Sequence, residues 1–152
     1  MYKSNMHETM TKKEWLKMYE LVNAAQEVYN TLGRGMQEPI YQEAMAIELS
    51  QRGIPFEREV ELCTWYKGVK LNKKYVADFM SEDVIIEFKS VTEITSDHRA
   101  QLFNYMRITD IKKGILVNYG ENSFHSERYV YDPTDDRYQL ITKNNLHRYV
   151  ED

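Results

Sequence analysis

Two acidic residues and a lysine near the middle of the chain have the types and spacing that suit chemistry on phosphate esters. Asp78 lies in YVADFM, whereas Glu87 and Lys89 lie in VIIEFKSV. Residues two apart on a strand share a face, and a short link between two strands would place Asp78 beside Glu87. Paired carboxylates repel each other and lose hydration, and a divalent cation such as Mg²⁺ or Mn²⁺ offsets both effects. Lys89 would then orient a metal-bound water or stabilise a charged transition state.

The same three residues also have a purely structural interpretation. Glu87 and Lys89 can form an ion pair on one face of a strand, while Asp78 is an exposed acid near a turn. Chance matches to the spacing of these three residues, D-x8-E-x-K, are common. The apolar residues on both sides of the motif favour a buried hairpin, and with it the metal-site interpretation.

The elements that must position these residues follow an α-α-β-β-β-α-β-β order. A capping box at Thr11–Glu14 begins the first helix, and the GRG sequence at 33–35 ends it. Pro39 suits the first turn of a second helix, and Ser96 or Asp97 is the expected cap of a third. The expected strands are PFEREVELCTWY, YVADFM, VIIEFKSV, GILVNYG and FHSERYVYDP. This order predicts an α/β fold with a mixed central sheet flanked by helices, and leaves the segment YQLITKNNLHRYVED ambiguous.

Length and composition indicate one globular domain spanning residues 1–152, of which residues 1–10 are expected to be a flexible tail. Hydrophobic residues make up 42% of the chain and charged residues 29%, which are usual values for this class. No apolar run reaches the roughly 20 residues of a membrane span, and the N-terminal sequence has no signal-peptide core. A single cysteine, Cys63, excludes an internal disulfide. We therefore expect a cytoplasmic protein without a membrane partner.

One segment is basic although the whole chain has a net charge of −4. No acidic residue lies between Leu62 and Ala77, and four lysines occur there: Lys67, Lys70, Lys73 and Lys74. These lysines form either a solvated turn or a surface that contacts nucleic-acid phosphates. Beside them, Trp65 and Tyr66 either stack on bases or pack under the turn.

Seven sequence blocks occur in a fixed order across roughly residues 15–130. The first, Gly35–Tyr41, reads G-x-x-E-x-x-Y, and the others are YQEAMAIELSQRGI, YKG, VADFM, VIIEFKSV, HRAQLFNY and GILVNYG. In this order the blocks closely resemble the GxxExxY protein family, a branch of the PD-(D/E)XK nuclease superfamily. The segment Gln101–Tyr105, which reads Q-x-x-x-Y, also resembles the helix motif of RecB-type nucleases in the same superfamily.

The resemblance implies a restriction-endonuclease-like core and a Mg²⁺- or Mn²⁺-dependent nuclease that acts on nucleic acid, with DNA favoured over RNA. By the same resemblance, Asp78 and Glu87 are metal ligands, the backbone carbonyl of Phe88 completes the metal shell, and Lys89 is the catalytic lysine. Glu38 matches the family's glutamate and would approach the metal directly or through water.

The helix motif implies that Gln101 lies near the lysine or a phosphate and that Tyr105 lines the site. Each assignment has a structural alternative. Glu38 can stabilise the start of its helix, Gln101 can be exposed to solvent, and Tyr105 can be a core residue. His98 is either a residue of the helix surface or a phosphate contact.

The alternative function is a module on the same fold that binds nucleic acid or a protein without catalysis. A homodimer or a protein partner would fit either function, because a chain of this size offers little surface for reading a sequence and because cutting two strands needs two sites or two events.

Overall fold

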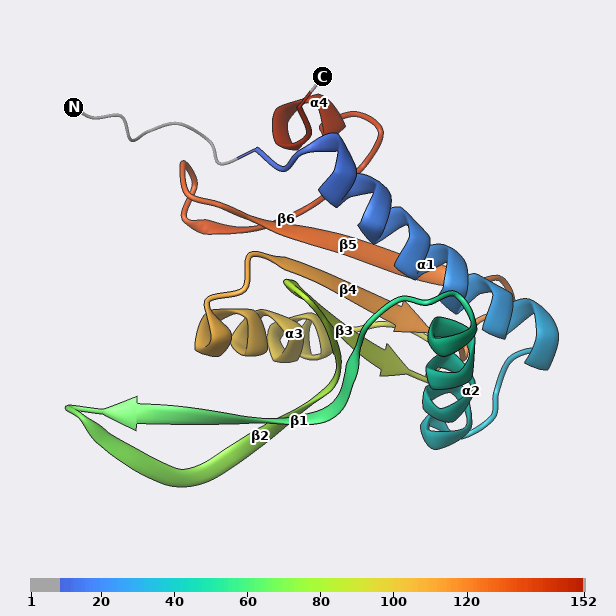
Figure 1. Ribbon diagram of the computed structural model, residues 1–152, viewed down its shortest axis with the longest axis horizontal. Helices are drawn as coiled ribbons and strands as arrows, with labels where there is room; N and C mark the ends of the chain where they lie inside the picture. Colours follow the sequence, from blue (N-terminus) through green and yellow to red (C-terminus); the bar gives the residue numbers. More distant parts are fainter. Residues whose placement is uncertain (1–8, 152) are drawn as a thin grey trace.

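Six strands form one mixed sheet, and helices lie on both of its faces (Figure 1). The computed structural model describes residues 9–151. The strands follow one another across the sheet in chain order: β1 (Glu57–Tyr66), β2 (Val69–Ser81), β3 (Val84–Lys89), β4 (Lys113–Asn118), β5 (His125–Asp132) and β6 (Arg137–Leu140). β3 and β4 are parallel, and the other neighbouring strands are antiparallel. This sheet confirms the α/β fold predicted from the sequence.

The helices divide between the two faces of the sheet. α1 (Lys12–Leu32) and α2 (Glu38–Gln51) pack on one face, whereas α3 (Ser96–Thr109) packs on the other and connects the parallel strands β3 and β4. The segment that was ambiguous in the sequence contributes most of β6 and a single turn, α4 (Leu146–Tyr149). None of the helices formed by residues 9–151 combines the length and apolarity that a bilayer span needs.

Alternation along β3 decides which side chains face which helices. Ile86 and Phe88 are buried on the α1 and α2 side, whereas Ile85 is buried on the α3 side. Side chains two residues apart share a face of a strand. Glu87 and Lys89 therefore lie with Ile85 on the α3 side, at the end of β3 that is farthest from the β2–β3 turn.

Several local features agree with the sequence-based expectations. Thr11 and Glu14 form the predicted capping box at the start of α1, and Gly33, with a φ of 77°, follows its last residue. The predicted hairpin is formed by β2 and β3, in which Ser81 pairs with Val84.

The cap of α3 differs from the prediction of Ser96 or Asp97. Thr95 is the N-cap, and its hydroxyl oxygen accepts a hydrogen bond from the backbone N–H of His98 at 3.4 Å. In return, Nδ1 of His98 accepts a hydrogen bond from the backbone N–H of Thr95 at 3.0 Å. These reciprocal bonds form a capping box in which a histidine takes the place of the usual glutamate, and the cap lies one residue before Ser96.

Most of the predicted N-terminal tail, residues 1–8, lies outside the described residues. Met10, the last residue of that prediction, is buried in the core, so the prediction is wrong at Met10. The backbone of Met10 accepts a hydrogen bond from Glu151 at 2.9 Å and donates one to Tyr149 at 2.8 Å. The approach to α1 is thus tied to the C-terminal segment of the chain.

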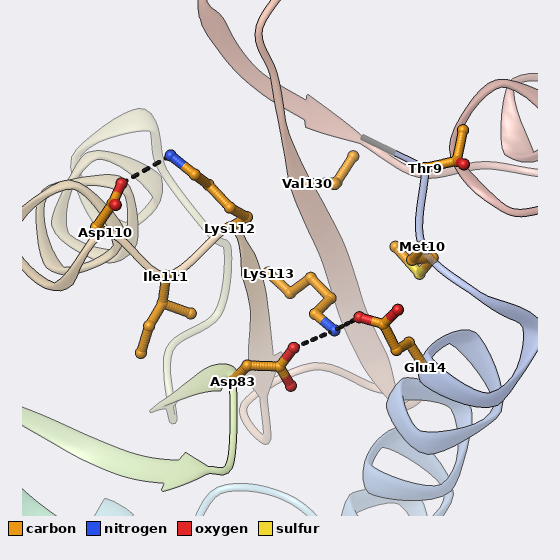
Figure 2. Close-up of a pocket in the computed structure, with 9 residues that line it drawn as sticks. All are labelled: Thr9, Met10, Glu14, Asp83, Asp110, Ile111, Lys112, Lys113 and Val130. Atoms are coloured by element: carbon orange, nitrogen blue, oxygen red, sulfur yellow. Dashed lines mark hydrogen bonds and ion pairs between the residues drawn. The ribbon is translucent and has the colours of Figure 1, made fainter. Parts of the chain in front are cut away.

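A buried lysine joins three elements at the end of the sheet where β4 begins (Figure 2). The ammonium of Lys113 lies 2.8 Å from a carboxylate oxygen of Glu14 and 2.6 Å from one of Asp83. Glu14 belongs to the cap of α1, and Asp83 belongs to the β2–β3 turn. The hydrogen bond from Lys113 lowers the pKa of the Glu14 carboxyl. This contact holds the helix start, the turn and β4 together.

We expect Lys113→Met to lower the free energy of unfolding by about 2 kcal/mol, because it leaves two carboxylates together without their cation. The loss is smaller than that for a fully buried pair, because the side chains of Glu14 and Asp83 are 40% and 56% exposed. The neighbouring Lys112, which pairs with the exposed Asp110, provides the control: Lys112→Met should cost less than about 1 kcal/mol. Urea unfolding measures both values, and equal losses would contradict a bridging role for Lys113.

Candidate active site

The strands β2 and β3 separate at Asp78 and Glu87, and the two carboxylates occupy the gap. The ladder of paired residues ends at Phe79 and Ile86. Beyond this pair, a carboxylate oxygen of Glu87 accepts a hydrogen bond from the backbone N–H of Asp78 at 2.6 Å. The Asp78 carboxylate in turn accepts one from the backbone N–H of Phe88 at 2.9 Å. Each acid is therefore held by the backbone of the opposite strand.

Burial makes both carboxyl groups hard to ionise. Glu87 is only 2% exposed, and Asp78 is partly buried. Loss of hydration is the main reason why the pKa of Glu87 lies well above its ordinary value, and the nearby charge of Asp78 raises it further. The pKa of Asp78 is also raised by burial, against the lowering effect of the Phe88 N–H. The pair thus forms a buried centre of negative charge that a cation would relieve.

Lys89 is held by α3 and not by Glu87. Its ammonium donates a hydrogen bond to the side-chain oxygen of Gln101 at 2.7 Å, and the amide nitrogen of Gln101 donates to the hydroxyl of Tyr105 at 2.9 Å. Its positive charge lowers the pKa of both Asp78 and Glu87, so the three groups act on one another. Among residues 9–151, no ion pair joins Glu87 and Lys89, which disagrees with the purely structural interpretation of the motif.

Gln101 and Tyr105 are one turn apart on the face of α3 that covers the site. Tyr105 is 5% exposed, and its ring packs against Tyr75 with 6.0 Å between ring centroids. Burial raises the pKa of its hydroxyl, and the charges of Glu87 and Asp78 raise it further. Tyr105 is therefore both a core residue and the end of the hydrogen-bond chain that reaches Lys89, so the two interpretations of its role are compatible.

Glu38 lies at the first position of α2, close enough to the acid pair for its charge to raise the pKa of both Asp78 and Glu87. The turn before α2 is fixed by Tyr41, whose hydroxyl donates to the carbonyl of Gly33 at 2.7 Å and accepts from the backbone N–H of Met36 at 3.0 Å. The tyrosine of the motif thus fixes the turn from which Glu38 extends.

The α1–α2 turn is also tied to the end of β3 and to the core. The hydroxyl of Ser90 donates to the carbonyl of Met36 at 2.5 Å, and the backbone N–H of Gly35 donates to the carbonyl of Tyr119 at 3.1 Å. The rings of Tyr41 and Tyr119 are stacked, with centroids 4.1 Å apart. Glu38 therefore extends from a rigid turn.

One acid near the site is not evident from the sequence motif. Glu59 lies on β1, where the pairs Arg58–Phe79 and Val60–Ala77 place it opposite Asp78, and its charge raises the pKa of that residue. The backbone of Glu59 has a φ of 50°, which is unusual for a residue other than glycine. In the sequence, Glu59 looks like one of several exposed acids on an alternating strand, and only the β1–β2 pairing brings it to the site.

Within residues 9–151, no hydrogen bond or ion pair joins the remaining predicted contacts to Asp78 or Glu87. His98 is partly buried and belongs to the capping box of α3, and its suggested phosphate contact remains a prediction. The four lysines of the basic segment are exposed on the β1–β2 hairpin, and the structure does not bring them to the carboxylates; they are Lys67, Lys70, Lys73 and Lys74. Trp65 and Tyr66 are 64% and 61% exposed, so neither packs under the turn.

The donor set suits a small divalent cation. No group of three or more acidic, histidine or cysteine side chains within residues 9–151 is arranged to hold a metal ion. Two carboxylates are nevertheless enough for Mg²⁺, which usually keeps several waters and takes one or two protein carboxylates. The buried charges of Asp78 and Glu87 fit this requirement, and the predicted third ligand is the backbone carbonyl of Phe88.

Comparisons with known proteins identify the superfamily of the chain and a similar fold. The family described as the PD-(D/E)XK nuclease superfamily matches residues 16–129, which are 114 of the 152 residues. Among solved structures, the crystal structure of SSO0001 is similar to this chain, with a TM-score of 0.50 and 18% sequence identity. The alignment covers 84% of this chain and 68% of SSO0001, and at this identity it shows a shared fold alone. A comparison with curated proteins found no match.

We expect Glu87→Gln to stabilise the protein at pH 7 in the presence of EDTA. Since the folded-state pKa values of Asp78 and Glu87 lie above the ordinary 3.8 and 4.5, the protonated forms favour folding, and stability is lost as pH rises through the raised values. The amide removes one of these charges but keeps an acceptor for the Asp78 N–H. Thermal unfolding between pH 4 and 8 should show a weaker loss with rising pH for the variant than for the wild type.

A divalent cation should make the wild type more stable than Glu87→Gln. Mg²⁺ or Mn²⁺ at a hundred times its dissociation constant should stabilise the wild type by about 2.7 kcal/mol, and should stabilise Glu87→Gln far less. Thermal unfolding with and without the cation measures the difference. An equal stabilisation of both proteins would place the ion elsewhere.

Proposed function

The chain belongs to the PD-(D/E)XK nuclease superfamily, and on this premise we propose that it is a metal-dependent nuclease that hydrolyses phosphodiester bonds of nucleic acid, with DNA as the substrate. The observation that carries the proposal is the buried pair Asp78 and Glu87, with Lys89 held beside it by Gln101. An ordinary structural ion pair would have joined Lys89 to Glu87 directly.

Asp78, Glu87 and the carbonyl of Phe88 are the proposed ligands of Mg²⁺ or Mn²⁺. When bound, the ion would lower the pKa of a coordinated water and offset the charge that develops on the phosphate. The two carboxylates face the gap where β2 and β3 separate, so their backbone hydrogen bonds hold them before any substrate arrives. This arrangement avoids reorganisation during the reaction.

Lys89 is the proposed catalytic lysine. Its ammonium has three N–H donors, of which Gln101 accepts one at 2.7 Å. The remaining donors can orient the attacking water or bind a non-bridging oxygen of the phosphate as negative charge increases there. Gln101 is a positioning residue, because it fixes Lys89, and Tyr105 in turn fixes the amide of Gln101.

Glu38 supports a narrower placement of the chain in the GxxExxY branch of the superfamily. The residues Gly35, Glu38 and Tyr41 match the motif that names the branch, and the Tyr41 hydroxyl holds the turn that carries the glutamate. The charge of Glu38 acts on Asp78 and Glu87, which suits an acid that approaches the metal through a water.

We expect Asp78→Asn and Lys89→Met each to lower the rate of DNA cleavage by at least about 100-fold, because each removes a group that acts on the metal or the transition state. Asparagine keeps an acceptor for the Phe88 N–H, so the fold should be retained. The assay is cleavage of plasmid and of single-stranded DNA with Mg²⁺ or Mn²⁺. Lys112→Met, at the opposite end of the sheet, is the control and should cleave at the wild-type rate.

Cleavage by both site variants would refute the assigned roles, and a wild type that neither cleaves nor responds to the cation would favour a non-catalytic binding module.

Replacement of Gln101 tests whether holding Lys89 in position contributes to the rate of cleavage. Gln101→Met leaves Lys89 present but unheld, so kcat should fall by about 10- to 100-fold with little change in KM. Gln101→Glu keeps an oxygen acceptor for the ammonium and should recover most of kcat. If methionine and glutamate at this position reduce the rate equally, the hydrogen bond to Lys89 is not what matters.

A further inference from the structure

The β1–β2 hairpin continues past α3 as a two-stranded arm (Figure 1), defined here as residues 63–74. At its base, Leu62 and Tyr75 are paired and pack on the α3 side of the sheet. At its tip, Lys67 and Gly68 have φ values of 49° and 80° and form a two-residue turn whose twist matches that of the strands. The arm is thus a defined β-ribbon with a rooted base.

The arm combines exposed rings with positive charge. Trp65, Tyr66 and Val69 are 64%, 61% and 65% exposed, which is high for large apolar side chains. The four lysines of the basic segment are all on the arm, and it carries no acidic residue, although the whole chain has a net charge of −4. The ammonium groups of Lys67 and Lys73 lie 5.4 and 5.5 Å from the ring centroids of Tyr66 and Tyr75.

We propose that the arm binds a single-stranded segment of the nucleic-acid substrate, with the lysines on its phosphates and with Trp65 and Tyr66 stacked on its bases. The inference rests on the proposed function and names the substrate class. Bases of an intact duplex are covered by their neighbours, whereas unpaired bases offer open faces to aromatic rings. An arm-to-arm contact between two copies of this chain fits the surface poorly, because two lysine-rich arms would repel each other.

The arm and the acid pair share one strand, which sets the geometry of the substrate. Lys70 and Asp78 are both on β2, and eight residues of extended strand span at most about 26 Å. At 3.4 Å per nucleotide, the spacing of one strand in a duplex, this distance corresponds to at most about eight nucleotides, because an unpaired strand can be more extended. A substrate would therefore need no more than about that length of unpaired strand beside the bond that is cut, as at an overhang or a flap.

Trp65 supplies a direct measurement of stacking. The chain has two tryptophans, and Trp15 is partly buried with the guanidinium of Arg128 4.9 Å from its ring centroid. In a Trp15→Phe background with EDTA, the fluorescence of Trp65 should be quenched by an oligothymidylate at a lower concentration than by a blunt duplex with the same number of phosphates. An unchanged fluorescence, or tighter binding of the duplex, would overturn the proposal.

Variants of the arm test the two kinds of contact separately. Trp65→Ala and Tyr66→Ala should each weaken binding of the oligothymidylate by about 10-fold or more. Lys67→Gln combined with Lys70→Gln should reduce the slope of log K against log salt by about 1.4, since each phosphate contact in a single strand contributes about 0.7. Tyr19→Ala is the matched control, because Tyr19 is 56% exposed but lies on α1.

The controls distinguish this inference from the proposed nuclease activity. The wild type should bind the oligothymidylate in EDTA, since the arm does not depend on the metal. If the wild type binds the oligonucleotide through Trp65 but cleaves no substrate, the arm proposal stands and the nuclease proposal fails. If Tyr19→Ala weakens binding as much as Trp65→Ala, or if Trp65→Ala only converts a dimer to a monomer in sedimentation, the arm proposal fails.

Discussion

The burial of two like charges at the point where β2 and β3 separate is the constraint on which the rest of the site depends. Asp78 and Glu87 cannot both ionise cheaply in this position, because burial and mutual repulsion oppose it. The backbone N–H groups of Asp78 and Phe88 lower this cost without cancelling it. The unfavourable interaction between the two carboxylates therefore persists in the folded protein, and the surrounding structure must be rigid enough to keep them together. Such an interaction is useful where a cation is to be bound.

The sheet supplies this rigidity because one of its faces packs into the apolar core while the other carries the residues of the site. On the α1 and α2 side, Ile86 and Phe88 pack into a continuous apolar core. On the α3 side, the alternate residues Glu87 and Lys89 replace apolar side chains. The helix α3 has two roles, because it connects the parallel strands and also carries Gln101 into contact with Lys89. The connection that the topology requires is thus also a wall of the candidate site.

Features set by local sequence could be predicted, whereas features set by distant pairing could not. The capping box of α1, the β2–β3 hairpin and the shared face of Glu87 and Lys89 follow from short-range spacing. The position of Glu59 beside Asp78 depends on the register of β1 against β2. Likewise, Arg99 donates hydrogen bonds of 2.8 and 2.9 Å to both carboxylate oxygens of Glu127, and no short-range pattern relates these two residues. The cap at Thr95 cannot be predicted from the usual motif, because a histidine stands where that motif has a glutamate.

The hydroxyl of Tyr41 restricts the length of the connection between α1 and α2. It bridges the carbonyl of Gly33 and the N–H of Met36, while its ring is stacked on Tyr119 inside the core. A connection that gained or lost a single residue would no longer meet both of these backbone groups. Sequence changes in the connection between α1 and α2 should therefore be substitutions, whereas insertions and deletions should occur elsewhere on the surface.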